Sequence, residues 1–176
     1  TYPRYAMTRA TYGLESGHTI GATYALREDA ADDLHENIEV DAKGPLPVSE
    51  GANFTAAFAM NRNYALGAWE TPINALKLNV ADVGFGNFTF SGNVRAIGPD
   101  FEPVAPKEST PGKSDILDFI GVRQLQGEIA TGVDLAGQAV TLTLGDDYRV
   151  NYDGTIDDGS TNKVYGKAEF SPSEPV

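Results

Sequence analysis

The sequence predicts an all-β protein, a β-sandwich or barrel of about 8–10 antiparallel strands with at most one or two short helices. Residues 87–97 alternate strictly, with Phe88, Phe90, Gly92, Val94 and Ala96 on one side. This pattern is typical of a strand that buries its apolar face and exposes the other. Two further alternating runs lie between Gln138 and Tyr152, and we interpret the Gly-Asp-Asp between them as a turn. The 19 Gly and 10 Pro in 176 residues favour frequent turns.

Composition excludes several classes of chemistry. The chain has no Cys, so disulfides, thiolate metal sites and cysteine catalysis are excluded. Its formal net charge of −12 at pH 7 argues against ordinary nucleic-acid binding. No run of 18 apolar residues occurs, so we expect no membrane span.

The first seventeen residues combine aromatic and basic side chains. Arg4 and Arg9 are interleaved with Tyr2, Tyr5 and Tyr12. Because Tyr and Arg are enriched at protein interfaces, we interpret residues 1–17 as an extended N-terminal arm that contacts another subunit. An arm packed on its own domain is the alternative.

Residues 18–40 predict a hairpin with a charged tip. Ile20, Ala22, Tyr24 and Leu26 alternate, an acidic patch follows, and Ile38 and Val40 recover the same period. A helix over 25–39 is the competing interpretation, because Ala, Leu, Arg and Glu all favour helices. A loop with two prolines and a strand with Phe54 and Phe58 on one face come next.

Trp69 and the proline-rich segment 98–113 are predicted contact regions. Trp69 is the only Trp, and we expect it to anchor a core or an interface. Segment 98–113 contains four prolines and Phe101, and we interpret it as a long excursion from one fold. Ser114 is a candidate cap for a short helix.

The C-terminal part predicts a three-stranded meander, with strands over 138–144 and 148–152 joined by a turn at 145–147 and a third strand over 163–170. The expected organisation is therefore an arm over 1–17, a single β domain over 18–170 that includes the excursion, and a tail over 171–176.

Candidate metal ligands are confined to one turn. Asp153, Asp157 and Asp158 could supply oxygen ligands for calcium, although Arg149 and Ser160 occupy positions where an EF-hand loop needs carboxylates. We favour a solvated Asp/Gly turn over this calcium site, and we expect no other cofactor. The two His residues have no partner at metal-ligand spacing, and no nucleophile motif frames Ser16, so we expect no enzyme.

These features favour a non-enzymatic structural subunit of a large homo-oligomeric assembly. Phage virion and tail-tube proteins and surface filaments have this general character. Its partners would be copies of itself and other structural proteins, joined through extended arms, in a virion or at the cell surface. The alternative is a secreted or surface β-sandwich that binds a ligand or glycan, with calcium as an option. An enzyme is the weakest hypothesis.

Overall fold

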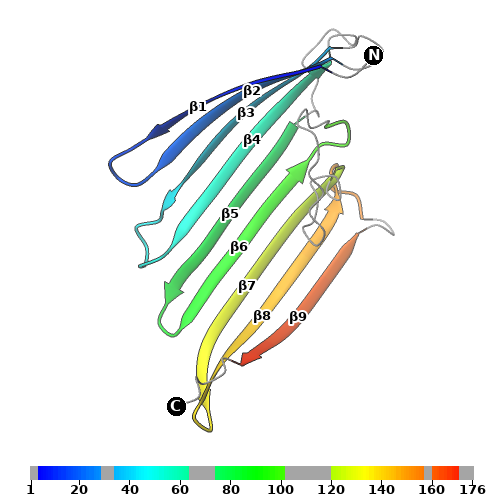
Figure 1. Ribbon diagram of the computed structural model, residues 1–176. Helices are drawn as coiled ribbons and strands as arrows, with labels where there is room; N and C mark the ends of the chain where they lie inside the picture. The colour runs from blue at the N-terminus through cyan, green and yellow to red at the C-terminus, as the bar shows by residue number, and fades with distance from the viewer. Residues whose placement is uncertain (1–3, 29–33, 64–73, 102–119, 157–159, 171–176) are drawn as a thin grey trace.

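The computed structural model describes residues 4–28, 34–63, 74–101, 120–156 and 160–170, and these ranges form nine β-strands (Figure 1). The strands are β1 (Arg4–Gly13), β2 (Thr19–Glu28), β3 (Leu34–Pro45), β4 (Asn53–Asn63), β5 (Asn74–Phe85), β6 (Phe88–Ile97), β7 (Val122–Leu135), β8 (Gln138–Asn151) and β9 (Thr161–Phe170). The all-β prediction is confirmed, and the described residues contain no helix.

All nine strands belong to one open sheet in the order of the chain, and every neighbouring pair is antiparallel. Within the described residues no second layer packs on this sheet, so neither a sandwich nor a barrel is confirmed. The N-terminal arm is not confirmed either, because residues 4–13 pair with β2 along their whole length. The edge strands β1 and β9 each pair on one side only in the described part of the chain.

The predicted hairpin over residues 18–40 is confirmed by β2 and β3, so the competing helix over 25–39 does not form. The predicted meander at the C-terminal end is wrong in one respect: residues 145–147 form no turn, because Gln138–Asn151 is a single strand, β8, that pairs along its whole length with β7, while the predicted last strand is confirmed as β9. Most of the excursion over 98–113, the candidate helix after Ser114 and the tail 171–176 lie outside the described residues. No helix in the described residues is long and apolar enough to cross a membrane.

The register places most large apolar side chains of the nine strands on one face, whereas Met7 and Ile97 fall on the other. Leu78 lies opposite Val94, Val94 opposite Leu125, and Leu125 opposite Tyr148. We call this surface the apolar face. Its large side chains are Tyr12, Ile20, Tyr24, Leu26, Ile38, Val40, Phe54, Phe58, Met60, Leu76, Leu78, Val80, Phe88, Phe90, Val94, Leu125, Ile129, Val133, Val140, Leu142, Leu144, Tyr148, Val150, Val164 and Phe170.

The opposite surface, which we call the polar face, is the more buried of the two. Gln124 is 4% exposed there, whereas its neighbour Leu125 on the apolar face is 57% exposed. The same contrast separates buried Asn61 from exposed Met60. The expectation that the side carrying Phe88 and Phe90 would be buried is therefore wrong for this chain by itself. Val140, at 1% exposure, is an exception on the apolar face.

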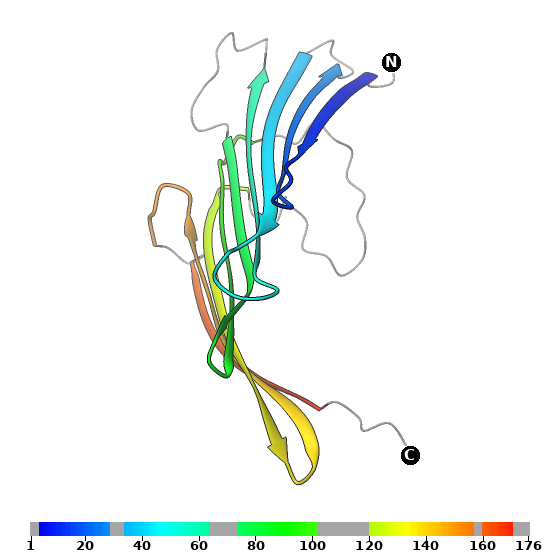
Figure 2. The same ribbon diagram turned by 90° about the vertical axis from the view of Figure 1, so that its left-hand side faces the viewer.

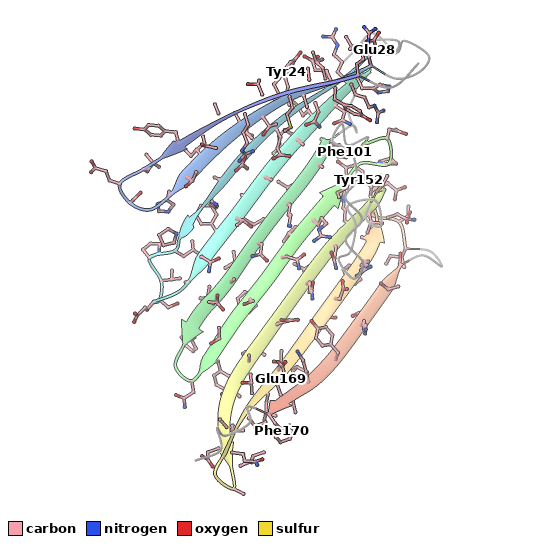
Figure 3. The ribbon with its side chains drawn as sticks, viewed as in Figure 1. Tyr24, Glu28, Phe101, Tyr152, Glu169 and Phe170 are labelled. Carbon is pink, nitrogen blue, oxygen red and sulfur yellow. The ribbon has the colours of Figure 1, made fainter. Side chains whose placement is uncertain are left out.

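The sheet is curved as well as twisted (Figure 2). Side chains crowd together on the concave side of a curved sheet, so we infer from the greater burial of the polar face that it is the concave side. The small apolar cluster of Ala59, Ala75, Ile97 and Phe101 also lies there, with Ile120 packed against it. Phe101 follows β6 near one end of the sheet, whereas Phe170 lies at the other end (Figure 3). The apolar face is consequently convex.

Candidate functional site

The polar face carries most of the charged side chains of the strands. Eight Lys and Arg residues and six Asp and Glu residues project from it, a formal charge of +2 in a chain of −12. They are Arg9, Arg27, Lys43, Lys77, Arg95, Arg149, Lys163 and Lys167, and Glu39, Asp41, Glu128, Asp134, Asp147 and Glu169. Many other acids, including Glu15, Glu50, Asp100 and Asp153, lie in turns.

A hydrogen-bonded chain crosses the polar face from β6 to β9. Asn93 Nδ2 donates to Gln126 Oε1 at 2.7 Å, Gln126 Nε2 donates to Tyr165 Oη at 3.1 Å, and Tyr165 donates to Glu128. Gly145 lies between Tyr165 and Glu128 in the sheet. A Cβ at residue 145 would come within 2.5 Å of Tyr165 Cζ, so glycine leaves the space that the phenol fills.

Arg9 makes a similar contact across three strands on the same face, near the β1 edge of the sheet. Its guanidinium donates to Thr23 Oγ1 at 2.7 Å on β2 and to Asp41 Oδ1 at 2.9 Å on β3. Gly21 lies directly beside Asp41, and a Cβ there would lie 2.5 Å from Arg9 Nη2. In both places, a glycine on the middle one of three neighbouring strands (Gly145 on β8, Gly21 on β2) leaves room for a long side chain to reach from the first strand to the third.

Asp147 is the centre of a third cluster. It accepts hydrogen bonds from Gln124 Nε2 at 2.7 Å and from Arg149 Nη2 at 2.7 Å. Burial would raise the pKa of Asp147, but the bonds from Arg149 and Gln124 and the charge of Arg149 outweigh it and hold the pKa below its usual value. The pKa of Arg95 is lowered by burial and by the neighbouring charge of Arg149.

A cavity of about 240 Å³ opens on the polar face between β4, β5 and β6. Its walls include Ala59, Ala75, Ile97 and Phe101, and Lys77, Arg95 and Glu39 also line it. Lys77 and Arg95 lie directly opposite one another on adjacent strands. The cavity thus combines an apolar wall with two cations and one carboxylate.

The apolar face has charged residues near one end of its strands. Arg4 lies opposite Glu28, with 3.7 Å between Arg4 Nη1 and Glu28 Oε2, and Glu36 lies opposite Arg62. At the same end, Arg123 Cζ lies 5.1 Å from the centre of the Tyr152 ring, and Tyr152 Oη donates to Asn74 Oδ1 at 2.6 Å. Two carboxylates lie between apolar residues of this face in the described strands: Glu36, which is 7% exposed, and Asp146, which is exposed.

The predicted interface residues are separated by the fold. Arg4, Tyr5, Arg9 and Tyr12 lie on the exposed edge strand β1, whereas Phe101 is 4% exposed and packs inside the chain. Tyr2 and Trp69 lie outside the described residues.

Of the predicted calcium ligands, only Asp153 is described. Its Oδ1 accepts hydrogen bonds from the backbone N and Oγ1 of Thr155, at 2.8 and 2.7 Å, and these bonds lower its pKa. Asp157 and Asp158 lie outside the described residues, so the three-residue site is untested. The described part of the chain contains no group of three or more acidic, His or Cys residues placed to hold a metal.

Ser16 Oγ and His18 Nδ1 lie 2.8 Å apart in the turn between β1 and β2. The His18 ring lies 5.9 Å from that of Phe54. This contact closes a turn, and nothing in it supplies the oxyanion donors or the third residue that a hydrolase needs.

Sequence reasoning missed Lys77, Arg95, Asp147 and Tyr165. One signal was available for two of them: Lys77 lies between Leu76 and Leu78 and Arg95 between Val94 and Ala96, so both fall on the polar side of the alternation. Comparisons with protein-family models, curated proteins and solved structures found no match.

Proposed function

We propose that this chain is a non-enzymatic structural wall element whose apolar face contacts the hydrocarbon of a lipid membrane and whose polar face lines an aqueous interior. The observation that carries the proposal is the reversed burial of the sheet, with amides such as Asn37, Asn61 and Gln124 buried on the polar face and large hydrocarbon side chains exposed on the apolar face. That distribution matches sheets that have lipid on one side and water on the other.

Water is a poor environment for the apolar face. Leu125, Leu144 and Val164 are 57, 57 and 69% exposed, and similar side chains continue across the strands. Monomeric soluble proteins rarely expose apolar patches beyond a few hundred Å². Some other apolar material must therefore cover this surface.

The curvature favours lipid over a second protein layer. Two convex surfaces touch along a narrow strip, so a second copy placed face to face would leave most apolar side chains uncovered. Acyl chains conform to a convex surface. The face also has shallow hollows beside Gly92 and Gly127.

The apolar band approaches the length of a membrane-spanning strand. On β2, β6 and β9 it covers Ile20–Leu26, Phe88–Ala96 and Val164–Phe170, seven to nine residues each. A tilted strand needs about 9–11 residues to cross a bilayer, so the band on β6 comes within that range and those on β2 and β9 are about two residues shorter. Charged pairs and Tyr152 border the band at one end, which fits the polar boundary of a bilayer.

The expectation of no membrane span was based on the lack of a continuous apolar run. A strand that alternates between two environments gives no such run, so that criterion does not detect it. The proposal keeps the structural, non-enzymatic role expected from the sequence. It also keeps association with further strands, including copies of this chain, because β1 and β9 present unpaired backbone edges in the described sheet.

Site-directed spin labelling tests the environment of both faces, and the absence of Cys makes single labels unambiguous. For nitroxides placed singly at positions 141, 142, 143 and 144 of the full protein in liposomes, the accessibility to oxygen and to a nickel reagent should alternate along the strand. Leu142 and Leu144 labels should be accessible to oxygen and shielded from a water-soluble nickel reagent, whereas Thr141 and Thr143 labels should show the reverse preference.

Low accessibility to both reagents at positions 142 and 144 would show that protein covers the apolar face and would reject the lipid assignment. Labels at positions 15 and 50, in turns, are the control for access of the nickel reagent from water.

A further inference from the structure

We infer that two copies of this chain associate edge to edge, with β1 of one copy paired antiparallel to β1 of the other about a twofold axis at Thr8. The interaction surface is the outer edge of β1, the side of the strand that faces away from β2. This inference concerns the edge of the sheet, so it does not depend on what covers the apolar face.

The outward backbone groups of β1 belong to its odd-numbered residues. In the turn after β1, the backbone N of Leu14 donates to the backbone oxygen of His18 at 2.8 Å, and this pair continues the register of Gly13 opposite Thr19. In an antiparallel pair, hydrogen-bonded residues alternate with residues whose N–H and C=O point away. Odd-numbered residues from Tyr5 onward therefore direct these groups away from β2.

The side chains of β1 are of the types found at interfaces. All ten residues of the strand are exposed. Tyr5, Met7 and Tyr12 are 50, 69 and 68% exposed. Tyr, Met and Arg are enriched where proteins contact one another. A second strand along this edge would cover part of these side chains.

Charge disfavours the same kind of pairing at the other edge of the sheet. Lys163 and Lys167 project from the polar face of β9, and Lys167 Nζ contacts Glu169 Oε1 of the same strand at 2.7 Å. Lysines on an edge strand oppose the addition of a further strand, because pairing would bring their ammonium groups against it. This feature favours β1 as the contact edge.

The two arginines of β1 are directed to carboxylates of their own chain. Arg4 Nη1 lies 3.7 Å from Glu28 Oε2 on β2, and Arg9 Nη2 lies 2.8 Å from Asp41 Oδ2 on β3. Both guanidinium groups thus reach across the sheet and not beyond its edge. The cations of β1 therefore oppose a further strand less than the lysines of β9 do.

Charge also selects the register. An axis at Thr8 places Arg4 opposite Tyr12 of the second copy, where a guanidinium can contact an aromatic ring, and Met7 opposite Arg9. An axis at Arg9 would place that arginine opposite itself, and like charges directly across a strand pair destabilise a sheet. An axis at Met7 would pair only residues 4–10, whereas the axis at Thr8 pairs residues 4–12.

This arrangement makes one surface of the two apolar faces. The twofold axis is perpendicular to the sheet, so both faces lie on the same side. Thr8 lies opposite Tyr24, near the middle of the apolar band of β2, Ile20–Leu26. The bands of the two copies are therefore level, while their strands run in opposite directions.

Disulfide cross-linking of the full protein in detergent micelles tests the partner and the register, because the chain has no Cys of its own. Micelles impose no direction of insertion on the two copies. Under mild oxidation Thr8→Cys should form a covalent dimer, because residue 8 lies opposite itself in a non-hydrogen-bonded pair. Such pairs bring the Cα atoms to about 4.5 Å, a separation that a disulfide spans.

Three further single-Cys proteins test the register. Ala10→Cys alone should stay uncross-linked, whereas a mixture of Ala6→Cys and Ala10→Cys proteins should cross-link, because residue 6 lies opposite residue 10 of the second copy. Ala168→Cys on β9 is the matched control for the other edge and should stay monomeric.

Proline at position 7 tests the backbone contact. Met7→Pro removes an N–H that points away from β2 and keeps the bonds of β1 to β2, so it should weaken dimerisation at least about tenfold with an unchanged circular dichroism spectrum. Met7→Ala keeps this N–H and should dimerise like the native protein. If Met7→Pro fails to fold, Met7→Lys replaces it, because it places a cation opposite Arg9 of the second copy. Sedimentation velocity in micelles measures the fraction of dimer.

Three results would each overturn the inference. They are a Thr8→Cys protein that stays monomeric under oxidation, cross-linking of Ala10→Cys or Ala168→Cys alone as efficient as that of Thr8→Cys, and a folded Met7→Pro or Met7→Lys protein that dimerises like the native one. None of them bears on the lipid assignment of the apolar face, which the spin labels test separately.

Discussion

Tyr165 on β9 lies over Gly145 on β8, and its hydroxyl donates a hydrogen bond past that glycine to Glu128 on β7. The contact joins three strands through side chains as well as through the backbone ladder. It also makes residue 145 a position where a methyl group has no room.

Substitution of Gly145 by Ala should lower the free energy of unfolding by about 1–3 kcal/mol, because the new methyl group displaces the Tyr165 ring. Denaturant unfolding followed by circular dichroism measures the loss. In a Tyr165→Ala background the same substitution should cost much less. Gly132→Ala on β7 is the matched control, because nothing lies within 4 Å of a Cβ at that position. Equal losses at positions 145 and 132 would contradict the steric explanation.

Tyr165 should make the fold sensitive to alkali. The hydrogen bond to Glu128, followed by burial, raises the pKa of Tyr165 above 10.0. A folded-state pKa above the unfolded value adds stability that is complete below pH 10 and lost as the pH rises through the folded pKa. Tyr165→Phe should remove that component, so the stabilities of the two proteins should converge at high pH. A constant difference across the titration would argue against this role for the phenol.

Asp147 should make the fold sensitive to acid. Its pKa lies below 3.8 because the bonds from Arg149 and Gln124 outweigh the effect of burial. A depressed folded-state pKa adds stability that is complete above the unfolded pKa and lost as the pH falls through the folded one. The advantage of the native protein over Asp147→Asn should therefore shrink below about pH 4. Unfolding curves from neutral to strongly acidic pH test this, with Glu15→Gln as a control for general acid effects.

Two adjacent residues of β8 should respond oppositely to a lysine. Leu142 lies on the apolar face and Thr141 on the polar face, and both are exposed. In lipid, Leu142→Lys should cost about 2–4 kcal/mol if position 142 lies at the middle of the bilayer. Thr141→Lys should be nearly neutral, since it places a cation opposite Glu169. Similar costs at both positions, measured by reversible unfolding in lipid, would contradict a lipid-facing apolar face.

Substitution of Asp146 can distinguish contact with lipid from contact with protein at the apolar face. A carboxylate that faces hydrocarbon destabilises a membrane sheet, although less than Lys or Arg does. Asp146→Leu should then raise the stability of the protein in lipid, by about 1 kcal/mol. If Asp146 instead contacts a cation on another subunit, the substitution should lower stability and weaken association, which analytical ultracentrifugation in detergent would detect.

Several strands could be predicted from the sequence, because alternation is a local property, but β1 was interpreted as an arm. The pattern from Phe88 to Ala96 identifies β6 without any knowledge of its neighbours, whereas Gly-Asp-Asp at 145–147, predicted as a turn, continues β8 because β7 pairs with it throughout. The helix-favouring composition of residues 25–39 was outweighed by the pairing of β2 with β3, in which Tyr24 lies opposite Ile38.

The environment of each face and the charged site were not predictable from the sequence alone. Alternation shows that Phe90 and Ser91 point to different sides, but which side is covered depends on curvature and on what lies against the sheet. The opposition of Lys77 and Arg95 follows from strand register, which a bulge between Val80 and Val83 alters near the turn. Tyr165 reaches Glu128 across 37 residues of sequence, a distance that no local pattern encodes.

An odd number of antiparallel strands gives the two free edges of this sheet the same polarity. Because β1 and β9 run in the same direction, joining them, within one molecule or between successive copies in a ring, would create a parallel seam in an otherwise antiparallel wall. A wall without such a seam needs an odd number of additional strands between the two edges. Alternatively, two copies can meet about a twofold axis, with β1 against β1 or β9 against β9.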